Sequence, residues 1–452
     1  MPTLSSQENS LLTSEQLLAL YRRAAFLEAF SLAEQLLRAF PGHPALLACA
    51  GDCALRLAWS AQNSGEWERA ESFYRRLLAI DPHHPEALFR LACLLQEQQQ
   101  QQDAEKLYRQ LLACQPQHPE AWYNLANLLK QDNRLPEALE SYQEVIRQQA
   151  DHARAWNNRG LLLQSMQQMD AAKQSLQEAI RLAPQQVDYW INLGNLLHKT
   201  GDNSSAETIY CHALTLQPQH AVCLCNLGIV LSERQRLPEA EQCYRAVLQL
   251  HPEHSEARWN LSLLLLRQER YAEGWEHYEA RLLPERRQTA LPSWPFPQWQ
   301  GESLHGLSLL LLCEQGFGDT IHFCRYITLL RRLGVRHVTL LCPAPLAVLL
   351  QSLPAVDQLL VEDEGDPPPH DYWLFLMSLP YRLGATVPLL PSALPYLTAP
   401  IERLRFWQNL LPADRLHIGV IWRGSPLHKN DQQRSLPSLR VLAPLWQISG
   451  VT

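Results

Sequence analysis

The chain has 452 residues, enough for two or three domains with full-sized cores, and its formal net charge of −7 argues against a general affinity for nucleic acid or anionic membranes. No apolar stretch approaches the ~20 residues that span a bilayer, and the N-terminus lacks the basic and apolar regions of a signal peptide. The eleven cysteines show no metal-ligand spacing, which indicates reduced thiols in a cytoplasmic protein and implies no metal.

A 34-residue repeat fills the first part of the chain. Prolines recur at positions 82, 116, 184, 218 and 252, and histidines follow two residues later at 84, 118, 152, 220 and 254. Apolar and small residues keep the same interval in units that begin near residues 51, 85, 119, 153, 187 and 221. The pattern resembles the tetratricopeptide repeat, a helix-turn-helix unit that stacks into a superhelix. It predicts an α-solenoid over residues 10–288, with about eight units including degenerate ends.

Five asparagines recur at the sixth position of consecutive repeats: Asn124, Asn158, Asn192, Asn226 and Asn260. This position lies off the apolar stripe, about 100° from the leucine that follows it. The first helices of a stacked solenoid line its concave face, so these amides are expected to form a ladder along that face. A carboxamide both donates and accepts, which makes the ladder a candidate site for a polypeptide backbone. The alternative is that the amides cap or cross-link adjacent repeats.

Inward positions of the same helices carry few lysines or arginines. A solenoid that clamps a carboxylate-terminated peptide would need convergent cations, so the sequence argues against that kind of ligand.

A proline- and tryptophan-rich joint at residues 289–301 is followed by a new domain. Helical stretches such as residues 320–333 separate a series of apolar runs, which indicates an α/β layered domain. The runs that predict buried parallel strands are residues 307–313, 337–342, 358–361, 372–377 and 417–422.

Two polar motifs follow predicted strands: Glu-Gln-Gly-Phe-Gly-Asp-Thr at residues 314–320 and Gly-Val-Ile-Trp-Arg-Gly-Ser-Pro at residues 419–426. With the repeats and the asparagine ladder, they give the chain a resemblance to the O-linked N-acetylglucosamine transferases. The second half looks more like the bacterial tetratricopeptide glycosyltransferases related to heptosyltransferases. The resemblance implies a GT-B fold of two facing Rossmann-like domains, with residues 302–413 on the acceptor side and residues 414–452 beginning the donor-binding domain. It also implies a nucleotide-sugar co-substrate, no other cofactor, and a polypeptide or glycan acceptor held along the solenoid.

The first motif supplies a candidate catalytic residue, Asp319. By the resemblance it would act as general base on the acceptor hydroxyl, a role that a carboxylate within hydrogen-bonding reach can fill. Gly316 and Gly318 form the turn before a helix N-terminus, where backbone amides can meet a polar substrate. The alternative is that Asp319 caps this helix, and Glu314 is a second candidate base.

The second motif opens a basic cluster of Arg423, His428, Lys429 and Arg434. Several cations within a dozen residues suit a leaving diphosphate, whose developing charge must be stabilised. Lys429 and Arg434 are the preferred candidates, Arg434 because a guanidinium can engage phosphate oxygens in a bidentate way. The alternative is a solvated basic loop paired with Asp431.

The chain ends at Thr452, where the donor-binding domain has only begun. A complete second half would need roughly 100 further residues. Two functions are therefore expected: a glycosyltransferase whose donor half is incomplete in this chain, or a non-catalytic scaffold that mediates protein–protein interaction.

Overall fold

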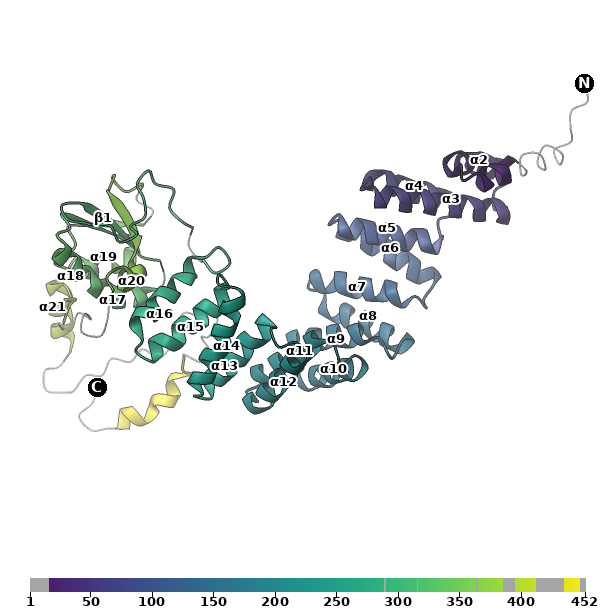
Figure 1. Cartoon of the computed structure of the whole chain (residues 1–452). Helices are drawn as coiled ribbons and strands as arrows, with labels where there is room; N and C mark the ends of the chain where they lie inside the picture. Colours follow the sequence, from purple (N-terminus) through teal and green to yellow (C-terminus); the bar gives the residue numbers. More distant parts are fainter. Residues whose placement is uncertain are drawn as a thin grey trace, which may run out of the picture. The chain divides into compact units, whose positions relative to one another are not determined.

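The computed structural model describes residues 16–287, 290–314, 316–362, 365–384, 395–411 and 435–447 (Figure 1). The chain divides into two compact units, Met1–Val247 and Leu248–Thr452, and each is described on its own. Among these described residues, no helix combines the length and the apolar character needed to cross a membrane.

The first unit is a stack of paired helices. Residues 16–22 are helical. The following helices are α2 (Phe26–Ala39), α3 (Pro44–Asn63), α4 (Trp67–Ile80), α5 (Pro85–Glu97), α6 (Gln101–Cys114), α7 (Pro119–Gln131), α8 (Leu135–Gln148), α9 (Ala153–Ser165), α10 (Met169–Leu182), α11 (Val187–Lys199), α12 (Asn203–Leu216), α13 (Ala221–Glu233) and α14 (Leu237–Leu250). From α5 onward the first helix of each pair has 13 residues and the second has 14. The predicted repeat is confirmed, and α3 is longer than the other helices of this unit, with 20 residues.

The periodic histidines start the first helices. In α5, α7, α9 and α13 the residue before the helix is a histidine whose Nδ1 accepts a hydrogen bond from the backbone N–H three residues later, at 3.0–3.3 Å. A backbone N–H in the first turn has no partner within the helix, so this bond satisfies it. Gln186 precedes α11 and makes no such bond. The sequence showed the histidine period but not this role.

A left-handed residue closes the turn inside each pair. The φ values lie between 59° and 84° at Gly65, Gln99, Asn133, Gln167, Gly201 and Gln235, which are spaced by 34 residues. Only two of these residues are glycines, so the remaining turns hold an L-residue in a conformation that costs about 1–2 kcal/mol.

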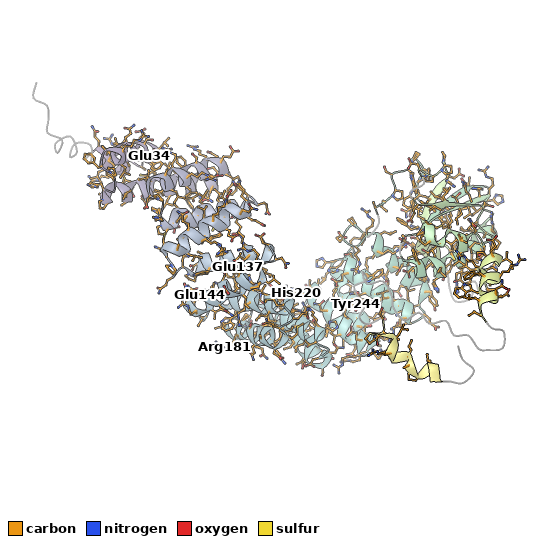
Figure 2. The ribbon with its side chains drawn as sticks, turned by 180° about the vertical axis from the view of Figure 1, so that it is seen from behind. Glu34, Glu137, Glu144, Arg181, His220 and Tyr244 are labelled. Carbon is orange, nitrogen blue, oxygen red and sulfur yellow. The ribbon has the colours of Figure 1, made fainter. Side chains whose placement is uncertain are left out.

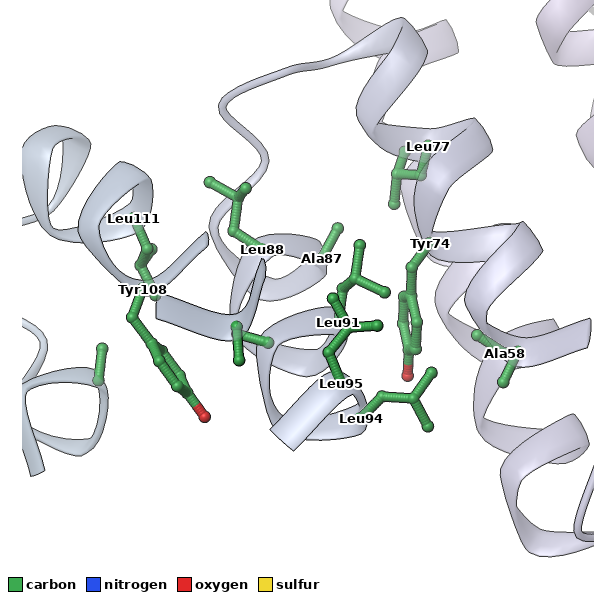
Figure 3. Packing of buried hydrophobic residues seen from close by; sticks show 14 of the residues in the cluster. Ala58, Tyr74, Leu77, Ala87, Leu88, Leu91, Leu94, Leu95, Tyr108 and Leu111 are labelled. Carbon is green, nitrogen blue, oxygen red and sulfur yellow. The ribbon is translucent and has the colours of Figure 1, made fainter. Parts of the chain in front are cut away.

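Tyrosines from the second helices fill the space between neighbouring pairs. Tyr74 of α4 lies beside Ala58 of α3 and beside Leu91 and Leu94 of α5 (Figure 3). In later repeats the small partner is glycine: a Cβ added at Gly194 would lie 2.4 Å from the Tyr210 ring. The close approach of small and large residues, expected from the sequence, is therefore the basis of the core.

The second unit joins two helices of a last repeat to a parallel sheet. Its elements are α15 (Ser255–Arg267), α16 (Tyr271–Tyr278), η1 (Glu279–Leu282), β1 (Ser308–Leu312), α17 (Phe317–Phe323), η2 (Cys324–Tyr326), α18 (Ile327–Leu330), η3 (Arg331–Leu333), β2 (His337–Cys342), α19 (Ala344–Leu350), β3 (Gln358–Val361), β4 (Tyr372–Phe375), η4 (Leu376–Ser378), α20 (Leu379–Arg382), α21 (Ile401–Leu410) and η6 (Leu439–Gln447). The strands run in the order β3-β2-β1-β4, all parallel, with Leu310 paired to Thr339 on one side and to Trp373 on the other.

Four predicted strands correspond to β1–β4, and the fifth, at residues 417–422, lies outside the described residues. The helix expected over residues 320–333 begins earlier, at Phe317, and is broken into four short helical segments before Gly334. A parallel α/β sheet is therefore present after the solenoid.

Candidate functional site

The asparagine ladder lies on consecutive first helices of the first unit. Asn124, Asn158, Asn192 and Asn226 occupy equivalent places on α7, α9, α11 and α13, and each side chain is half-buried. We call the surface formed by these four side chains the ladder face. The fifth member, Asn260, belongs to α15 in the second unit, where its buried Nδ2 has no partner among the described contacts.

The amide N–H groups of the ladder bond to the preceding repeat. Asn192 Nδ2 donates to Asn157 Oδ1 at 2.9 Å, and Asn226 Nδ2 donates to Asn195 Oδ1 at 2.8 Å. Asn158 Nδ2 donates both to the Tyr123 hydroxyl and to Asn127, at 3.0 and 3.2 Å. The amides thus do cross-link adjacent repeats, which was the alternative expectation for them.

The carbonyl oxygens of the ladder are less engaged. Asn158 Oδ1 accepts a bond from Asn157. For Asn124, Asn192 and Asn226 no donor to Oδ1 is found within the described part of the chain. A ligand on the ladder face would therefore meet hydrogen-bond acceptors more often than donors.

A pocket of about 350 Å³ opens beside Asn158. Besides Asn158, its walls are formed by residues of α7, α9 and α11 and by the turn before α11. These residues are Tyr123, Arg154, Asn157, Gln186, Asp188 and Tyr189.

Four pocket residues are departures from the repeat's own pattern. Gln186 replaces the capping histidine, and Tyr189 replaces the alanine or cysteine found at the third helical position elsewhere. Arg154 stands at the second position, where the neighbouring repeats carry Glu120 and Asp188. Asn157 is a buried polar residue at a position that is apolar in the other repeats.

Only Asn158 of this pocket was predicted from the sequence. The signal for the others was present, because each departure is visible when the repeats are aligned on their 34-residue period. Its meaning depended on the structure, which brings the departures from two successive repeats to one place.

Tyr189 has an unusual environment for a buried tyrosine. It is 7 % exposed and lines the pocket, yet its hydroxyl has no hydrogen-bond partner among the described residues. By contrast, the buried hydroxyls of Tyr74, Tyr108, Tyr142 and Tyr210 each donate to a side chain of the first helix of their own pair. Burial raises the pKa of Tyr189, and nearby Arg154 opposes that shift while Tyr123 and Asp188 add to it.

The two charged residues of the pocket, Asp188 and Arg154, differ in the partners they have. The Asp188 carboxylate accepts a bond from Gln186 Nε2 at 3.1 Å and lies 3.9 Å from Nε2 of His220. Arg154 is exposed and has no carboxylate partner in the described part of the chain.

A second candidate site is the carboxyl edge of the sheet, where the strand order reverses between β1 and β4. Open α/β sheets bind ligands at such a point. Asp319 lies in the first turn of α17, half-buried, with Gly316 as the residue before the helix and Gly318 exposed beside it. Within the described residues, no side-chain hydrogen bond from Asp319 to the first turn of α17 is found, and its acidic side chain lies in that turn.

Buried ionic contacts occupy this edge. Arg281 of η1 donates to Glu314 Oε1 at 2.8 Å and to Ser378 Oγ at 2.7 Å, and it also pairs with Glu279. Glu314 accepts a further bond from the backbone N–H of Met377 at 3.3 Å. Burial raises the pKa of Glu314, and Arg281 opposes the shift. The Glu314 carboxylate thus accepts hydrogen bonds from two other segments, η1 and η4.

The remaining predicted site residues, Arg423, His428, Lys429 and Arg434, lie outside the described residues. Within the part of the chain that the structure describes, no group of three or more histidine, cysteine or acidic side chains is arranged to hold a metal ion.

Comparisons with known proteins give a consistent family. One model of the tetratricopeptide repeat matches residues 55–119, 89–153, 123–165 and 225–286. A second matches residues 153–186, and a third matches residues 187–220. No curated protein sequence matches the chain.

Solved structures that are similar to parts of the chain include a tetratricopeptide repeat protein from Parabacteroides merdae, with 16% identity and a TM-score of 0.44 over 52% of this chain and 93% of that one. Another is pilF of Pseudomonas aeruginosa, with 22% identity and a TM-score of 0.40 over 46% and 94% of the two chains. A third is YrrB, described as a TPR protein with an unusual peptide-binding site, with 22% identity and a TM-score of 0.34 over 40% and 93%.

Proposed function

Because residues 55–220 and 225–286 of this chain belong to the tetratricopeptide-repeat family, we propose that the protein is an interaction scaffold that binds an extended polypeptide on the ladder face. The pocket beside Asn158 is the anchor point of this surface. The partner is a polypeptide segment rather than a folded surface, because a row of half-buried amides suits a backbone that exposes its N–H and C=O groups.

One observation carries the proposal: the first helices depart from their own pattern at Arg154, Asn157, Gln186 and Tyr189, and all four line one pocket. Packing requires the repeated residues, since each repeat buries the same face against the next. It does not require these four departures. Tyr189 in particular places on the pocket wall a hydroxyl that has no partner among the described residues, where the other repeats place a small residue, and a binding role explains that placement.

The cross-links made by the ladder are compatible with binding. They fix the amides in place before a ligand arrives, so less conformational freedom is lost on association. They also leave the Oδ1 atoms of Asn192 and Asn226 to accept backbone N–H groups of a bound segment.

The test uses a random library of 12-residue peptides displayed through their C-termini and selected on the full chain. We expect specific peptides to be enriched and to lose at least about tenfold in affinity for a Gln186→Trp variant, whose indole fills the pocket. Gln185→Trp is the matched control, since Gln185 is exposed and does not line the pocket. Failure to enrich any peptide, or equal binding to both variants, would contradict the proposal.

Glycosyl transfer is a second candidate function, favoured by the position of Asp319 next to the point where the strand order reverses. In that function Asp319 would be the general base, Gly316 and Gly318 would approach the acceptor, and Arg423, His428, Lys429 and Arg434 would bind a nucleotide-sugar. The ion pair of Arg281 and Glu314 at the same edge counts against it. Incubation of the chain with nucleotide-sugars tests this candidate: turnover that is lost in Asp319→Ala supports it, and absence of turnover removes it.

A further inference from the structure

The pocket on the ladder face has an excess of unused hydrogen-bond donors. The Tyr189 hydroxyl has no hydrogen-bond partner within the described residues, and only 7 % of the residue's surface is exposed. The Tyr123 hydroxyl accepts a bond from Asn158 Nδ2, so its own hydrogen is directed elsewhere and is not donated to any described group. Arg154 adds a guanidinium that has no carboxylate partner in the described part of the chain.

The amide oxygens of Asn157 and Asn158 in the pocket are already engaged. Asn157 Oδ1 accepts from Asn192, and Asn158 Oδ1 accepts from Asn157. The Asp188 carboxylate receives the hydrogen of Gln186 Nε2 and faces His220. His220 uses Nδ1 to accept the backbone N–H of Cys223 at 3.2 Å, so its Nε2 carries the hydrogen that points toward Asp188.

From this imbalance we propose that the pocket takes a carboxylate, and that it belongs to an aspartate or glutamate side chain within the bound polypeptide. Arg154 pairs with the carboxylate, and the hydroxyls of Tyr123 and Tyr189 donate to its oxygens. Charge-assisted hydrogen bonds of this kind are the strong ones, and a guanidinium can form two of them with one carboxylate. The inference rests on the proposed polypeptide-binding function and names the group that the pocket recognises.

A side-chain carboxylate fits better than the C-terminal carboxylate of a peptide. A terminal carboxylate would need convergent cations, and Arg154 is the only cation that lines the pocket within the described residues. The neighbouring repeats carry Glu120 and Asp188 at the equivalent position. Glu120 repels an acidic group one register away, and Asp188, which itself lines the pocket, confines the acidic side chain to the Arg154 side of it.

The test uses the 12-residue peptides selected through their C-termini, so that only side-chain carboxylates are available during selection. We expect the enriched sequences to share an acidic residue. Its replacement by the matching amide should weaken binding to the wild-type chain by about 10- to 100-fold, because a hydrogen-bonded charge is lost. The same replacement should change binding to Arg154→Met far less. Amidation of the synthetic peptide's C-terminus should have no effect.

Two variants separate recognition from folding. Tyr189→Phe removes a hydroxyl that no described group of the protein contacts, so its melting temperature should match the wild type while the acidic peptide binds several-fold more weakly. Arg181→Met is the matched charge control, because Arg181 lies on α10 and pairs there with Glu178.

Three results would overturn the inference: enriched peptides without a shared acidic residue, an amide replacement that weakens wild type and Arg154→Met equally, or a loss of binding on C-terminal amidation alone. If no peptide is enriched, the proposed function itself fails, which is a distinguishable outcome.

Discussion

Arg281 and Glu314 form an ion pair at 2.8 Å in which each side chain is only 5 % exposed. The pair joins η1, which directly follows the last repeat helix α16, to the residues that follow the first strand of the sheet. Trp259 and Trp275 of the same repeat pack against the core of the sheet domain. The last repeat is therefore built into the second compact unit, and its buried ion pair occupies the edge where an α/β sheet usually binds a ligand.

Breaking this ion pair should destabilise the second unit. Arg281→Met leaves the Glu314 charge buried without its partner, and such losses cost about 3–5 kcal/mol. The measurement is hydrogen exchange in the peptides that cover β1 and β4, which reports on this unit alone. The double variant Arg281→Met with Glu314→Gln should recover part of the protection, because the Glu314 charge is gone while Glu279, the other partner of Arg281, keeps its own. Equal exchange in the single variant and the wild type would show that the pair contributes little.

The capping role of the histidines predicts different stability costs for two substitutions at His118. His118 accepts the backbone N–H of Ala121 through Nδ1 at 3.1 Å. His118→Ala should cost about 0.5–2 kcal/mol, whereas His118→Asn keeps a capping oxygen and should cost much less. Exchange of the Ala121 amide measures the effect locally. If the alanine and asparagine variants behave alike, the packing of the ring against Phe89 matters and the cap does not.

The left-handed turns predict that substitution by glycine at some of these positions stabilises the protein. Gln167 has a φ of 62°, a conformation that costs an L-residue about 1–2 kcal/mol. Gln167→Gly should therefore raise the melting temperature, although the added freedom of glycine in the unfolded chain offsets part of the gain. Gly201→Ala, at the equivalent turn, is the reciprocal change and should lower it. An unchanged or lower melting temperature for Gln167→Gly would contradict this account of the turns.

The fold of the first unit could be predicted from the sequence because its contacts are local and repeated. Each helix packs mainly on its neighbours along the chain, so a 34-residue period fixes both the helices and their partners. The strands of the second unit could be placed from their apolar runs, since parallel strands are buried on both faces. The role of the histidines could not, because histidine is not a usual capping residue.

The binding pocket was harder to predict because its residues come from different repeats. Asn158 belongs to a regular ladder and was visible at once. Tyr189 and Arg154 gain their meaning only from their common pocket. Arg281 and Glu314 are 33 residues apart and belong to different kinds of structure, so no local pattern in the sequence indicates that they pair.

The sheet domain should lose stability in mild acid through His370. This side chain is 9 % exposed, its Nδ1 donates to the carbonyl of Pro368 at 2.6 Å, and its Nε2 accepts from Thr339 at 2.7 Å. Burial lowers its pKa, His337 lowers it further, and Asp371 opposes the shift. The neutral ring is favoured in the folded state, so its contribution to stability is present above about pH 6.5 and is lost as the pH falls through the lower folded pKa.

Hydrogen exchange in β2 and β4 measures this effect after correction for the intrinsic exchange rate. Protection should fall between pH 6.5 and 5 in the wild type and change less in His370→Gln, which keeps a donor and an acceptor but cannot titrate. A parallel pH profile for the two proteins would show that His370 is not the group responsible.

The central claim is that a polypeptide binds at the pocket of the ladder face, and site-specific photo-cross-linking tests it most directly. A selected peptide that carries p-benzoylphenylalanine is irradiated with the wild-type chain, and the adduct yield is compared at Gln186, which lines the pocket, and at Arg181, which is exposed on the second helix α10 (Figure 2). The account predicts a covalent adduct at position 186 and none at position 181. Adducts of equal yield at both positions, or at position 181 alone, would contradict it.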